Sequence, residues 1–266
     1  MKNAFQGRTV IVTGASSGIG RETALAFAEA GANVVLAARR QDALEQIVSE
    51  HPAWRERMLI LRTDVTRDEE VSRLIDATIS RFGRIDILVN NAGIGSHAPI
   101  ADTRPEDAHR LMEVNFFGPL RCIQAALPHM TNQTPNSQGV RGQIVNIGSV
   151  LSILAMPQNG MYSAAKFALR GLSDSLRMEL RATGIDVILI MPGHIDTPFF
   201  ENQIRYDGLA SARFGKGAPP RNVARAILRA CAHREREVVL TLPAKLGVWT
   251  KRFAPRLLDF CLARIR

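Results

Sequence analysis

The chain is 266 residues long, 46% of them hydrophobic, and it carries a formal net charge of +9. This length and hydrophobic share are sufficient for one large buried core, whereas no stretch approaches the roughly 18 consecutive apolar residues that a membrane span needs. The cysteines Cys122, Cys231 and Cys261 are too few and too scattered for a disulfide framework or a metal site, which favours a reducing, cytoplasmic location. The positive charge comes without a nucleic-acid-binding motif, so we expect no nucleic-acid partner. The scattered cysteines likewise lead us to expect no bound metal.

Predicted strands and helices alternate along the chain. Strands are predicted near residues 8–13, 33–38, 57–63, 86–90, 142–148, 185–191 and 237–241, with helices near 19–30, 41–51, 67–82, 106–131, 160–183 and 219–233. The polar stretch 131–142 is predicted to be an exposed loop. This order predicts an α/β fold, a single-domain, Rossmann-like, doubly wound parallel sheet of about seven strands with helices on both faces. Ligands bind such sheets at the carboxyl ends of the strands.

The first predicted strand ends in a glycine-rich turn that contains Gly14, Gly18 and Gly20. Glycines permit a tight turn and let the backbone approach a pyrophosphate at the positive end of the following helix. The spacing differs from G-x-G-x-x-G, because three residues separate Gly14 from Gly18. The β-branched run before the turn, the helix after it and the second strand supply the context of a dinucleotide-binding βαβ unit.

The end of the second predicted strand bears on the choice of cofactor. An acidic residue there favours NAD by accepting hydrogen bonds from the adenosine ribose, whereas an arginine can pair with the 2′-phosphate of NADP. The chain has Arg39 and Arg40 at this point and no carboxylate before Asp42. We therefore expect Arg39 to be the phosphate partner, assisted by Arg40 and by Ser16 of the glycine-rich turn. NADP(H) is therefore the favoured cofactor and NAD(H) is the alternative. If the two arginines bind no phosphate, they are an exposed pair that opens a helix.

Tyr162 and Lys166 lie four residues apart in a predicted helix, and Ser149 lies thirteen residues before the tyrosine. Residues at positions i and i+4 share one helix face, so the ammonium group can lie beside the phenol. A nearby positive charge favours the phenolate and would lower the pKa of the tyrosine from its reference value of about 10. Ser149 can then direct its hydroxyl at a carbonyl or alcohol oxygen. The alternative is a helix with an exposed lysine and a half-buried tyrosine.

From about residue 8 to residue 200, the chain resembles the short-chain dehydrogenase/reductase family. The motifs that carry the resemblance occur in the expected order along the sequence. They are the turn from Thr13 to Gly20, Asp64-Val65, the run from Asn90 to Gly93, Asn115, Ser149, Tyr162, Lys166 and Pro192-Gly193.

The resemblance implies a catalytic role for four residues. Ser149 would position the substrate oxygen and Tyr162 would donate or remove the proton. Lys166 would hold the nicotinamide ribose and tune the tyrosine, and Asn115 would retain a water that connects Lys166 to solvent. A polar residue that kinks its helix is the structural alternative for Asn115.

The resemblance also implies contacts with the cofactor along this whole edge of the sheet. Asp64 would accept a hydrogen bond from the adenine amino group, while the Ile195 backbone and the Thr197 hydroxyl would hold the nicotinamide amide and the pyrophosphate. Ser17 stands where many NADP-using members carry a second basic residue. The full expected set is Gly14, Ser16, Ser17, Gly18, Ile19, Gly20, Arg39, Arg40, Asp64, Val65, Asn91, Ala92, Gly93, Tyr162, Lys166, Pro192, Gly193, Ile195 and Thr197.

These expectations favour an NADP(H)-dependent oxidoreductase that interconverts a ketone or aldehyde and an alcohol. Apolar residues after the fourth strand, after Ser149 and at Phe199-Phe200 suggest a lipophilic small molecule as its substrate. Two alternatives are a non-catalytic NADP(H)-binding sensor and a membrane-peripheral lipid or sterol-type reductase. A sensor would typically have lost Tyr162 or Lys166, and both are present.

The chain is expected to divide into a catalytic domain, residues 1–242, and a basic amphipathic tail, residues 243–266. Residues of about 199–220 resemble the lid over the substrate in this family, and the helices near 106–131 and 160–183 pair members into homodimers or homotetramers. In the tail, Pro255 predicts a division into two short helices. The tail can dock its apolar side on protein, which is slightly favoured, or lie on an anionic membrane surface, which would make the protein membrane-peripheral.

Overall fold

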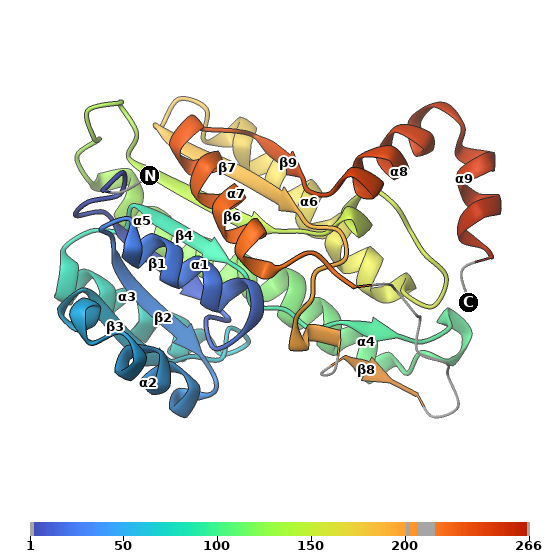
Figure 1. Ribbon diagram of the computed structural model, residues 1–266. Helices are drawn as coiled ribbons and strands as arrows, with labels where there is room; N and C mark the ends of the chain where they lie inside the picture. The colour runs from blue at the N-terminus through green and yellow to red at the C-terminus, as the bar shows by residue number, and fades with distance from the viewer. Residues whose placement is uncertain (1–2, 201–202, 207–215, 265–266) are drawn as a thin grey trace.

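The computed structural model describes residues 3–200, 203–206 and 216–264, and it is built around a seven-stranded parallel sheet (Figure 1). The strands follow the order β3-β2-β1-β4-β6-β7-β9. Their bounds are β1 (Thr9–Thr13), β2 (Asn33–Ala38), β3 (Met58–Arg62), β4 (Ile87–Asn90), β6 (Gly142–Ile147), β7 (Ile185–Met191) and β9 (Glu237–Val239). All seven predicted strands and the predicted fold class are confirmed.

Helices cover both faces of the sheet. Because side chains alternate along a strand, Val10 and Val12 of β1 enter the core on one face while Ile11 enters the core on the other. Both cores are apolar, which explains why the central strands read as continuous hydrophobic runs. The first face is covered by α1 (Gly18–Glu29), α2 (Gln41–Glu50) and α7 (Pro220–His233), the second by α3 (Asp68–Phe82), α5 (Gly118–Asn132) and α6 (Gly160–Glu179).

The prediction of one continuous helix over residues 106–131 is wrong, because the structure has two helices joined by a different helical turn. The structure has α4 (Pro105–Met112), one π-helical turn over Glu113–Phe117, and then α5. Asn115 lies fully buried in this turn, where its side chain accepts a hydrogen bond from Ile94 N at 3.2 Å and donates one to Ile94 O at 2.9 Å. The polar residue thus interrupts the regular helix because its side chain binds the backbone of another segment.

Several short elements of two to six residues were not predicted, because such lengths carry little periodic signal. Strand β5 (Ser96–His97) pairs in parallel with β8 (Ile204–Arg205). Helical turns occur at Pro52–Arg57, Ile100–Asp102, Val150–Ser152 and Pro198–Phe200. Of the expected lid, residues 201–202 and 207–215 lie outside the described residues, Arg213 among them.

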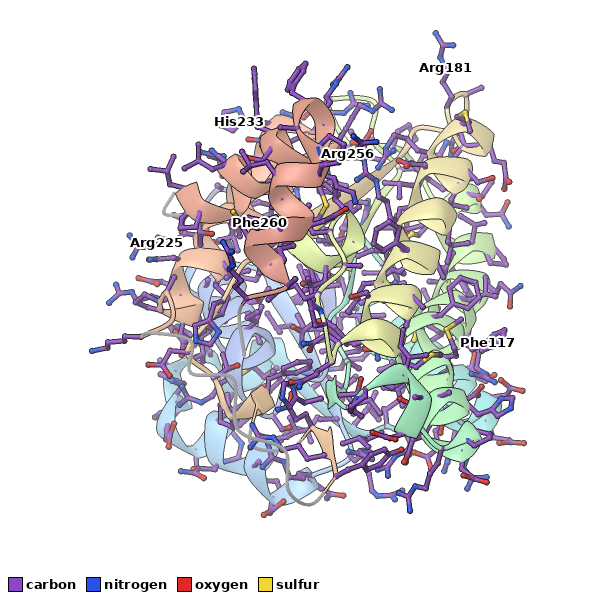
Figure 2. All side chains as sticks on the ribbon, turned by 90° about the vertical axis from the view of Figure 1, so that its right-hand side faces the viewer. Phe117, Arg181, Arg225, His233, Arg256 and Phe260 are labelled. Atoms are coloured by element: carbon purple, nitrogen blue, oxygen red, sulfur yellow. The ribbon has the colours of Figure 1, made fainter. Side chains whose placement is uncertain are left out.

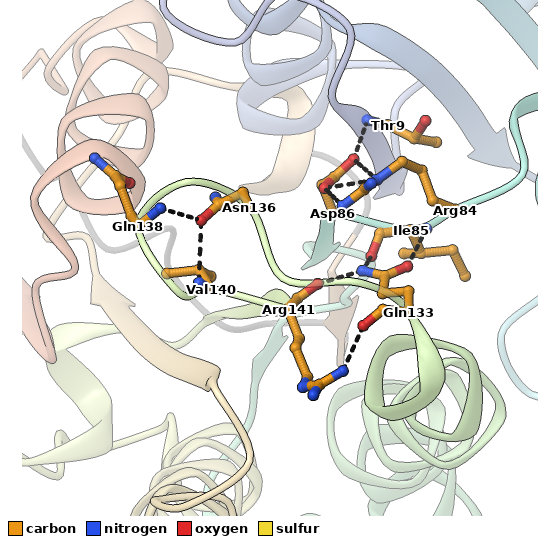
Figure 3. Close-up of polar contacts among 9 residues, drawn as sticks. All are labelled: Thr9, Arg84, Ile85, Asp86, Gln133, Asn136, Gln138, Val140 and Arg141. Carbon is orange, nitrogen blue, oxygen red and sulfur yellow. Dashed lines mark hydrogen bonds and ion pairs between the residues drawn. The ribbon is translucent and has the colours of Figure 1, made fainter.

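The loop between α5 and β6 is present as predicted, and it is tied down by side-chain hydrogen bonds (Figure 3). The Gln133 amide donates to Ile85 O at 2.8 Å and accepts from Ile85 N at 3.2 Å, and it also donates to Arg141 O. Asn136 accepts from Val140 N at 3.0 Å. These bonds fix the residues just before β4 and β6, two strands whose other ends carry candidate site residues.

Helix α6 uses most of its apolar residues on the sheet. Leu169, Leu176 and Leu180 are buried, whereas the Phe167 side chain is 44% exposed. Only part of the apolar residues of this helix therefore remains at the surface, and the pairing of helices between copies stays a prediction. Leucines spaced three or four residues apart face the core here, as in any helix packed on a sheet.

The tail forms α8 (Leu242–Phe253) and α9 (Pro255–Leu262), and the predicted division at Pro255 is confirmed. Both helices stand beyond the carboxyl ends of β6 and β7 (Figure 1). Within the described residues, no helix combines the length and the apolar character needed to cross a bilayer.

Candidate active site

The predicted site residues come together along one edge of the sheet. Strands β1, β4, β6 and β7 are neighbours in the sheet, and because they are parallel their carboxyl ends meet at the same edge (Figure 1). The sheet order reverses beside β1, which is where ligands bind in open α/β sheets. The segments that follow these four strands carry the glycine-rich turn, Asn91, Ser149 and Thr197.

The glycine-rich turn is held against the end of β4. Gly14 has φ +66°, and a side chain there would lie 2.9 Å from Ala92 Cα. A side chain on Gly20 would lie 2.3 Å from Gly14 O. The Asn91 amide donates to Thr13 O at 2.9 Å, a role in shaping the turn that sequence reasoning missed. Only glycine fits at these positions, and the turn leads directly into the N-terminus of α1.

The segment after β7 lies across the same turn. Gly18 has φ +54°, and a side chain at this position would lie 3.1 Å from Thr197 Cγ2. Asp196 N donates to Ala218 O at 3.0 Å, and Ala218 N donates to His194 O at 3.0 Å. These backbone bonds hold the loop that was expected to bind the nicotinamide end next to the turn that was expected to bind the pyrophosphate.

At the other end of the edge, Asp64 faces a cavity of about 370 Å³ that Arg39 and Thr66 also line. Asp64 Oδ1 accepts hydrogen bonds from Thr66 N at 3.0 Å and from Thr66 Oγ1 at 2.8 Å. Burial acts to raise the pKa of Asp64, but the Thr66 hydrogen bonds and the charges of Arg39 and Arg67 outweigh it and lower the pKa. The carboxylate is thus held ionised beside a space lined by an arginine.

The two arginines after β2 differ in their contacts. Arg40 Nη2 donates to Ser16 Oγ at 3.2 Å, whereas Arg39 acts on Asp64. Both side chains are exposed. Arg40 is thus the arginine that contacts the glycine-rich turn. The expected grouping of Arg39, Arg40 and Ser16 around a phosphate stays a prediction.

Ser149 follows β6 and begins the helical turn Val150–Ser152. Its Oγ accepts a hydrogen bond from Leu151 N at 3.1 Å, and its own N donates to Ser152 Oγ at 3.1 Å. Val150 N donates to Pro192 O at 2.8 Å, which joins this turn to the end of β7. The reciprocal capping arrangement orients the Ser149 hydroxyl, which also forms a hydrogen bond with Tyr162.

Tyr162, Lys166 and Asn115 converge around Gly93. Lys166 Nζ lies 5.7 Å from the centre of the Tyr162 ring and donates to Ile147 O at 2.9 Å. A side chain on Gly93 would lie 2.8 Å from Asn115 Oδ1 and 3.8 Å from Lys166 Nζ. The four expected catalytic residues therefore form one cluster, and the absence of a side chain at position 93 leaves room for it.

Burial dominates the acid–base properties of this cluster. It raises the pKa of Tyr162 to about 12, partly opposed by the hydrogen bond with Ser149, and it lowers the pKa of Lys166 to about 8. The expected lowering of the tyrosine pKa by the lysine charge is absent, because Nζ is directed at the Ile147 carbonyl and is itself poorly solvated. In this state Tyr162 is a proton donor at neutral pH.

Comparison with known proteins decides the family. Residues 8–207 match the family model for short chain dehydrogenase. The chain belongs to the short-chain dehydrogenase family. It is 37% identical over 261 residues to the uncharacterized oxidoreductase YxnA of Bacillus subtilis. The matched region covers 97% of this chain and 72% of that protein. The resemblance stated from the sequence motifs is confirmed, and the chain is an oxidoreductase of this family.

Solved structures of short-chain dehydrogenases share the fold. One from Burkholderia phymatum, in complex with NAD, superposes with a TM-score of 0.84 at 26% identity and covers 97% of this chain and 96% of that chain. An alcohol dehydrogenase from Thermococcus sibiricus, complexed with 5-hydroxy-NADP, gives a TM-score of 0.74 at 27% identity, covering 88% of this chain and 95% of that chain.

In this short-chain dehydrogenase, Tyr162 has neighbours that sequence reasoning predicted and others that it missed. The Tyr162 ring lies 5.8 Å from the Phe199 ring, a residue that was expected near the substrate. Tyr162 also packs on an apolar cluster of Leu151, Leu154 and Leu258. Leu258 belongs to α9, so the tail contributes to the apolar cluster next to Tyr162. A leucine in an amphipathic tail gives no signal of this position, which only the folded chain reveals.

Proposed function

We propose that this chain is an NADP(H)-dependent oxidoreductase that interconverts a ketone or aldehyde and an alcohol by hydride transfer. The observation that carries the proposal is the cluster of Ser149, Tyr162, Lys166 and Asn115 beside a glycine-rich turn at the carboxyl edge of the sheet. A hydrogen-bonded serine and tyrosine can bind and protonate one substrate oxygen.

The residues present fit a dinucleotide. A side chain at Gly14 or Gly20 would strike neighbouring backbone, so the turn keeps its amides accessible at the start of α1. Ser17 makes no side-chain cap on this helix and no acidic residue occupies its first turn, so the positive end of the helix is uncompensated by local side chains. A bound nicotinamide dinucleotide would supply hydride for carbonyl reduction and accept it in alcohol oxidation. Asp64, Val65, Asn91, Ala92 and Gly93 would line its adenosine half and Pro192, Gly193, Ile195 and Thr197 its nicotinamide half.

Each catalytic side chain then has a distinct task. Ser149 Oγ hydrogen-bonds the substrate oxygen and stabilises the negative charge that develops there during reduction. The Tyr162 hydroxyl donates its proton to that oxygen, for which its raised pKa is suited. Lys166 would hold the nicotinamide ribose of a bound cofactor, and its charge would stabilise the phenolate that remains. Asn115 supports the Ile94 backbone and a water-mediated proton path from Lys166 to solvent.

NADP(H) is proposed in preference to NAD(H). Two exposed arginines follow β2, and no carboxylate occupies that position. Arg40 already contacts Ser16, and Arg39 lines the cavity beside Asp64, so a 2′-phosphate between them would be met by two guanidinium groups.

The surroundings of Tyr162 support a lipophilic small-molecule substrate. Phe199 and the cluster of Leu151, Leu154 and Leu258 supply apolar surface next to its ring. A cytoplasmic homodimer or homotetramer that contacts membranes through its tail completes the proposal, with residues 1–242 as the catalytic domain and 243–266 as the tail.

The test is a screen of lipophilic ketones and aldehydes with NADPH, and of secondary alcohols with NADP. The readout is the change in absorbance of the reduced cofactor. We expect turnover with NADPH on at least one apolar carbonyl compound, and none with the Tyr162→Phe variant. Stable binding of NADPH without turnover on any class would favour the sensor alternative.

A further inference from the structure

The outer face of the tail helices carries a large exposed apolar surface. Successive exposed apolar side chains on α8 are spaced four, three and four residues apart, so they share one face of this helix, and α9 exposes two more. These side chains, called the stripe below, are Leu242, Leu246, Trp249, Phe253, Leu257 and Phe260, each between 54% and 70% exposed. Exposed patches of this kind mark interaction sites in soluble proteins.

The inner face of the same helices is docked on the body. Leu258 is buried in the cluster with Leu151 and Leu154, and a side chain on Gly247 would lie 3.0 Å from Leu154 Cδ1. Trp249 and Phe253, by contrast, lie on the exposed side of α8. Because the inner contacts hold the helices in place, the stripe is a preformed surface and faces away from the body.

The tail helices also carry basic side chains. In the described part of the tail these are Lys245, Lys251, Arg252, Arg256 and Arg264, against one acidic residue, Asp259, which pairs with Lys251 at 3.7 Å. The Arg252 guanidinium lies 5.8 Å from the centre of the Phe253 ring, and that of Arg264 lies 3.5 Å from the centre of the Phe260 ring. Figure 2 looks onto this end of the molecule and shows Arg256 and Phe260 on the tail helices. Positive charge and aromatic surface are thus presented together.

We infer that the stripe and these basic side chains bind the surface of an anionic lipid bilayer. Such a surface accepts aromatic and leucine side chains at the headgroup boundary and neutralises the cations beside them. A second copy of the chain is the less suitable occupant, because a two-fold contact places the same patch against itself and would bring two sets of cations together. The inference rests on the membrane contact within the proposed function, to which it adds the face and the lipid class.

Tryptophan fluorescence can serve as a probe of the stripe. The chain has two tryptophans, so in Trp54→Phe the single remaining tryptophan is Trp249, which lies in the stripe. In this background we expect cosedimentation with vesicles of phosphatidylglycerol and phosphatidylcholine at low salt, together with a blue shift of Trp249 emission. Binding should weaken at high salt and on vesicles of phosphatidylcholine alone.

Two sets of variants separate the apolar and basic contributions. We expect Leu246→Ser with Phe253→Ser, and Lys251→Gln with Arg252→Gln and Arg256→Gln, each to reduce vesicle affinity by at least about ten-fold. All five residues are exposed, so the fold should be retained. The matched controls replace exposed residues away from the tail and should bind as the parent protein does: Met178→Ser, and Arg55→Gln with Arg73→Gln and Arg181→Gln.

Three results would overturn the inference. They are a parent protein that ignores anionic vesicles at low salt, an equal loss of binding in the arginine control, and a dimer that dissociates in the Leu246→Ser, Phe253→Ser variant without any vesicle binding. Because vesicle binding requires no turnover, Tyr162→Phe should bind as the parent does, so a failure of the oxidoreductase proposal would be seen separately.

Discussion

At the scale of single residues, the site depends on a few groups whose burial sets their chemistry. Tyr162 lies between Ser149 and Lys166, and burial keeps its hydroxyl protonated at neutral pH. The same burial leaves Lys166 with a pKa of about 8, so its charge varies within an ordinary range of assay pH. The two shifts have opposite signs because a low-dielectric environment disfavours both the phenolate and the ammonium.

Tyr162→Phe tests the role of the phenol proton. The ring and its contact with Phe199 are retained, so we expect NADPH affinity within a few-fold of the parent value and a decrease in kcat of about 10²-fold to 10⁴-fold. The measurements are steady-state reduction of the best carbonyl substrate and NADPH titration by fluorescence. Near-complete retention of kcat would falsify the assignment of Tyr162 as the proton donor.

Lys166→Met tests the effect of the buried ammonium on stability. The folded-state pKa of about 8 lies below the ordinary value of 10.5. Between these pH values the unfolded chain holds a proton that the folded chain has released, so the unfolding free energy rises as the pH rises through this window. From pH 7 to pH 10, we expect the parent to gain about 1–3 kcal/mol relative to Lys166→Met in urea unfolding. Parallel pH profiles for the two proteins would contradict the lowered pKa.

Cofactor choice is tested by substituting the two arginines separately. Loss of a charged hydrogen bond to phosphate costs about 1.5–3 kcal/mol, so Arg39→Gln and Arg40→Gln should each weaken NADPH binding by at least about ten-fold and leave NADH binding nearly unchanged. Arg67→Gln is the matched control, because Arg67 also acts on Asp64 but lies before α3 rather than after β2. Equal losses for NADPH and NADH would show that the arginines shape the site without reading the phosphate.

At the scale of elements, the interruption between α4 and α5 supports the loop after β4. Both polar atoms of the Asn115 side chain are used by the Ile94 backbone. In Asn115→Ala these backbone groups would lose their partners, and we expect a loss of unfolding free energy of about 1–3 kcal/mol together with lower kcat. Urea unfolding and steady-state kinetics check both effects; an unchanged unfolding midpoint would show that other groups replace the lost bonds.

The sequence predicts long periodic elements well and contacts between distant segments poorly. The seven strands follow from β-branched runs such as the one that ends at Thr13, and the break at Pro255 follows from the missing amide of proline. The π-helical turn at Asn115 was not predicted as such, because it depends on Ile94, which lies in another part of the chain. The contact of Arg40 with Ser16 has a similar origin, since it depends on the direction in which the chain leaves β2.

At the scale of the whole molecule, two separate surfaces compete as explanations of self-association. One is the proposed pairing of α5 and α6, on which Phe167 is 44% exposed, and the other is the stripe on α8 and α9. The two lie on different elements, so single substitutions distinguish them. The α6 surface is the proposed interface between copies, whereas the basic side chains of the tail disfavour a contact of the stripe with itself.

Phe167→Glu and Leu257→Glu form the decisive pair. Each places a carboxylate on an exposed apolar position, Phe167 on α6 and Leu257 on α9. A buried and unpaired charge at a two-fold contact faces its own copy, so we expect Phe167→Glu to weaken the dimer by at least about ten-fold and Leu257→Glu to leave it intact. Sedimentation velocity over a range of micromolar concentrations measures both variants against the parent. A parent protein that sediments only as a monomer would contradict the proposed α6 interface. Dissociation caused by Leu257→Glu alone would show that the interface lies on the tail, where the partner copy would prevent binding to lipid.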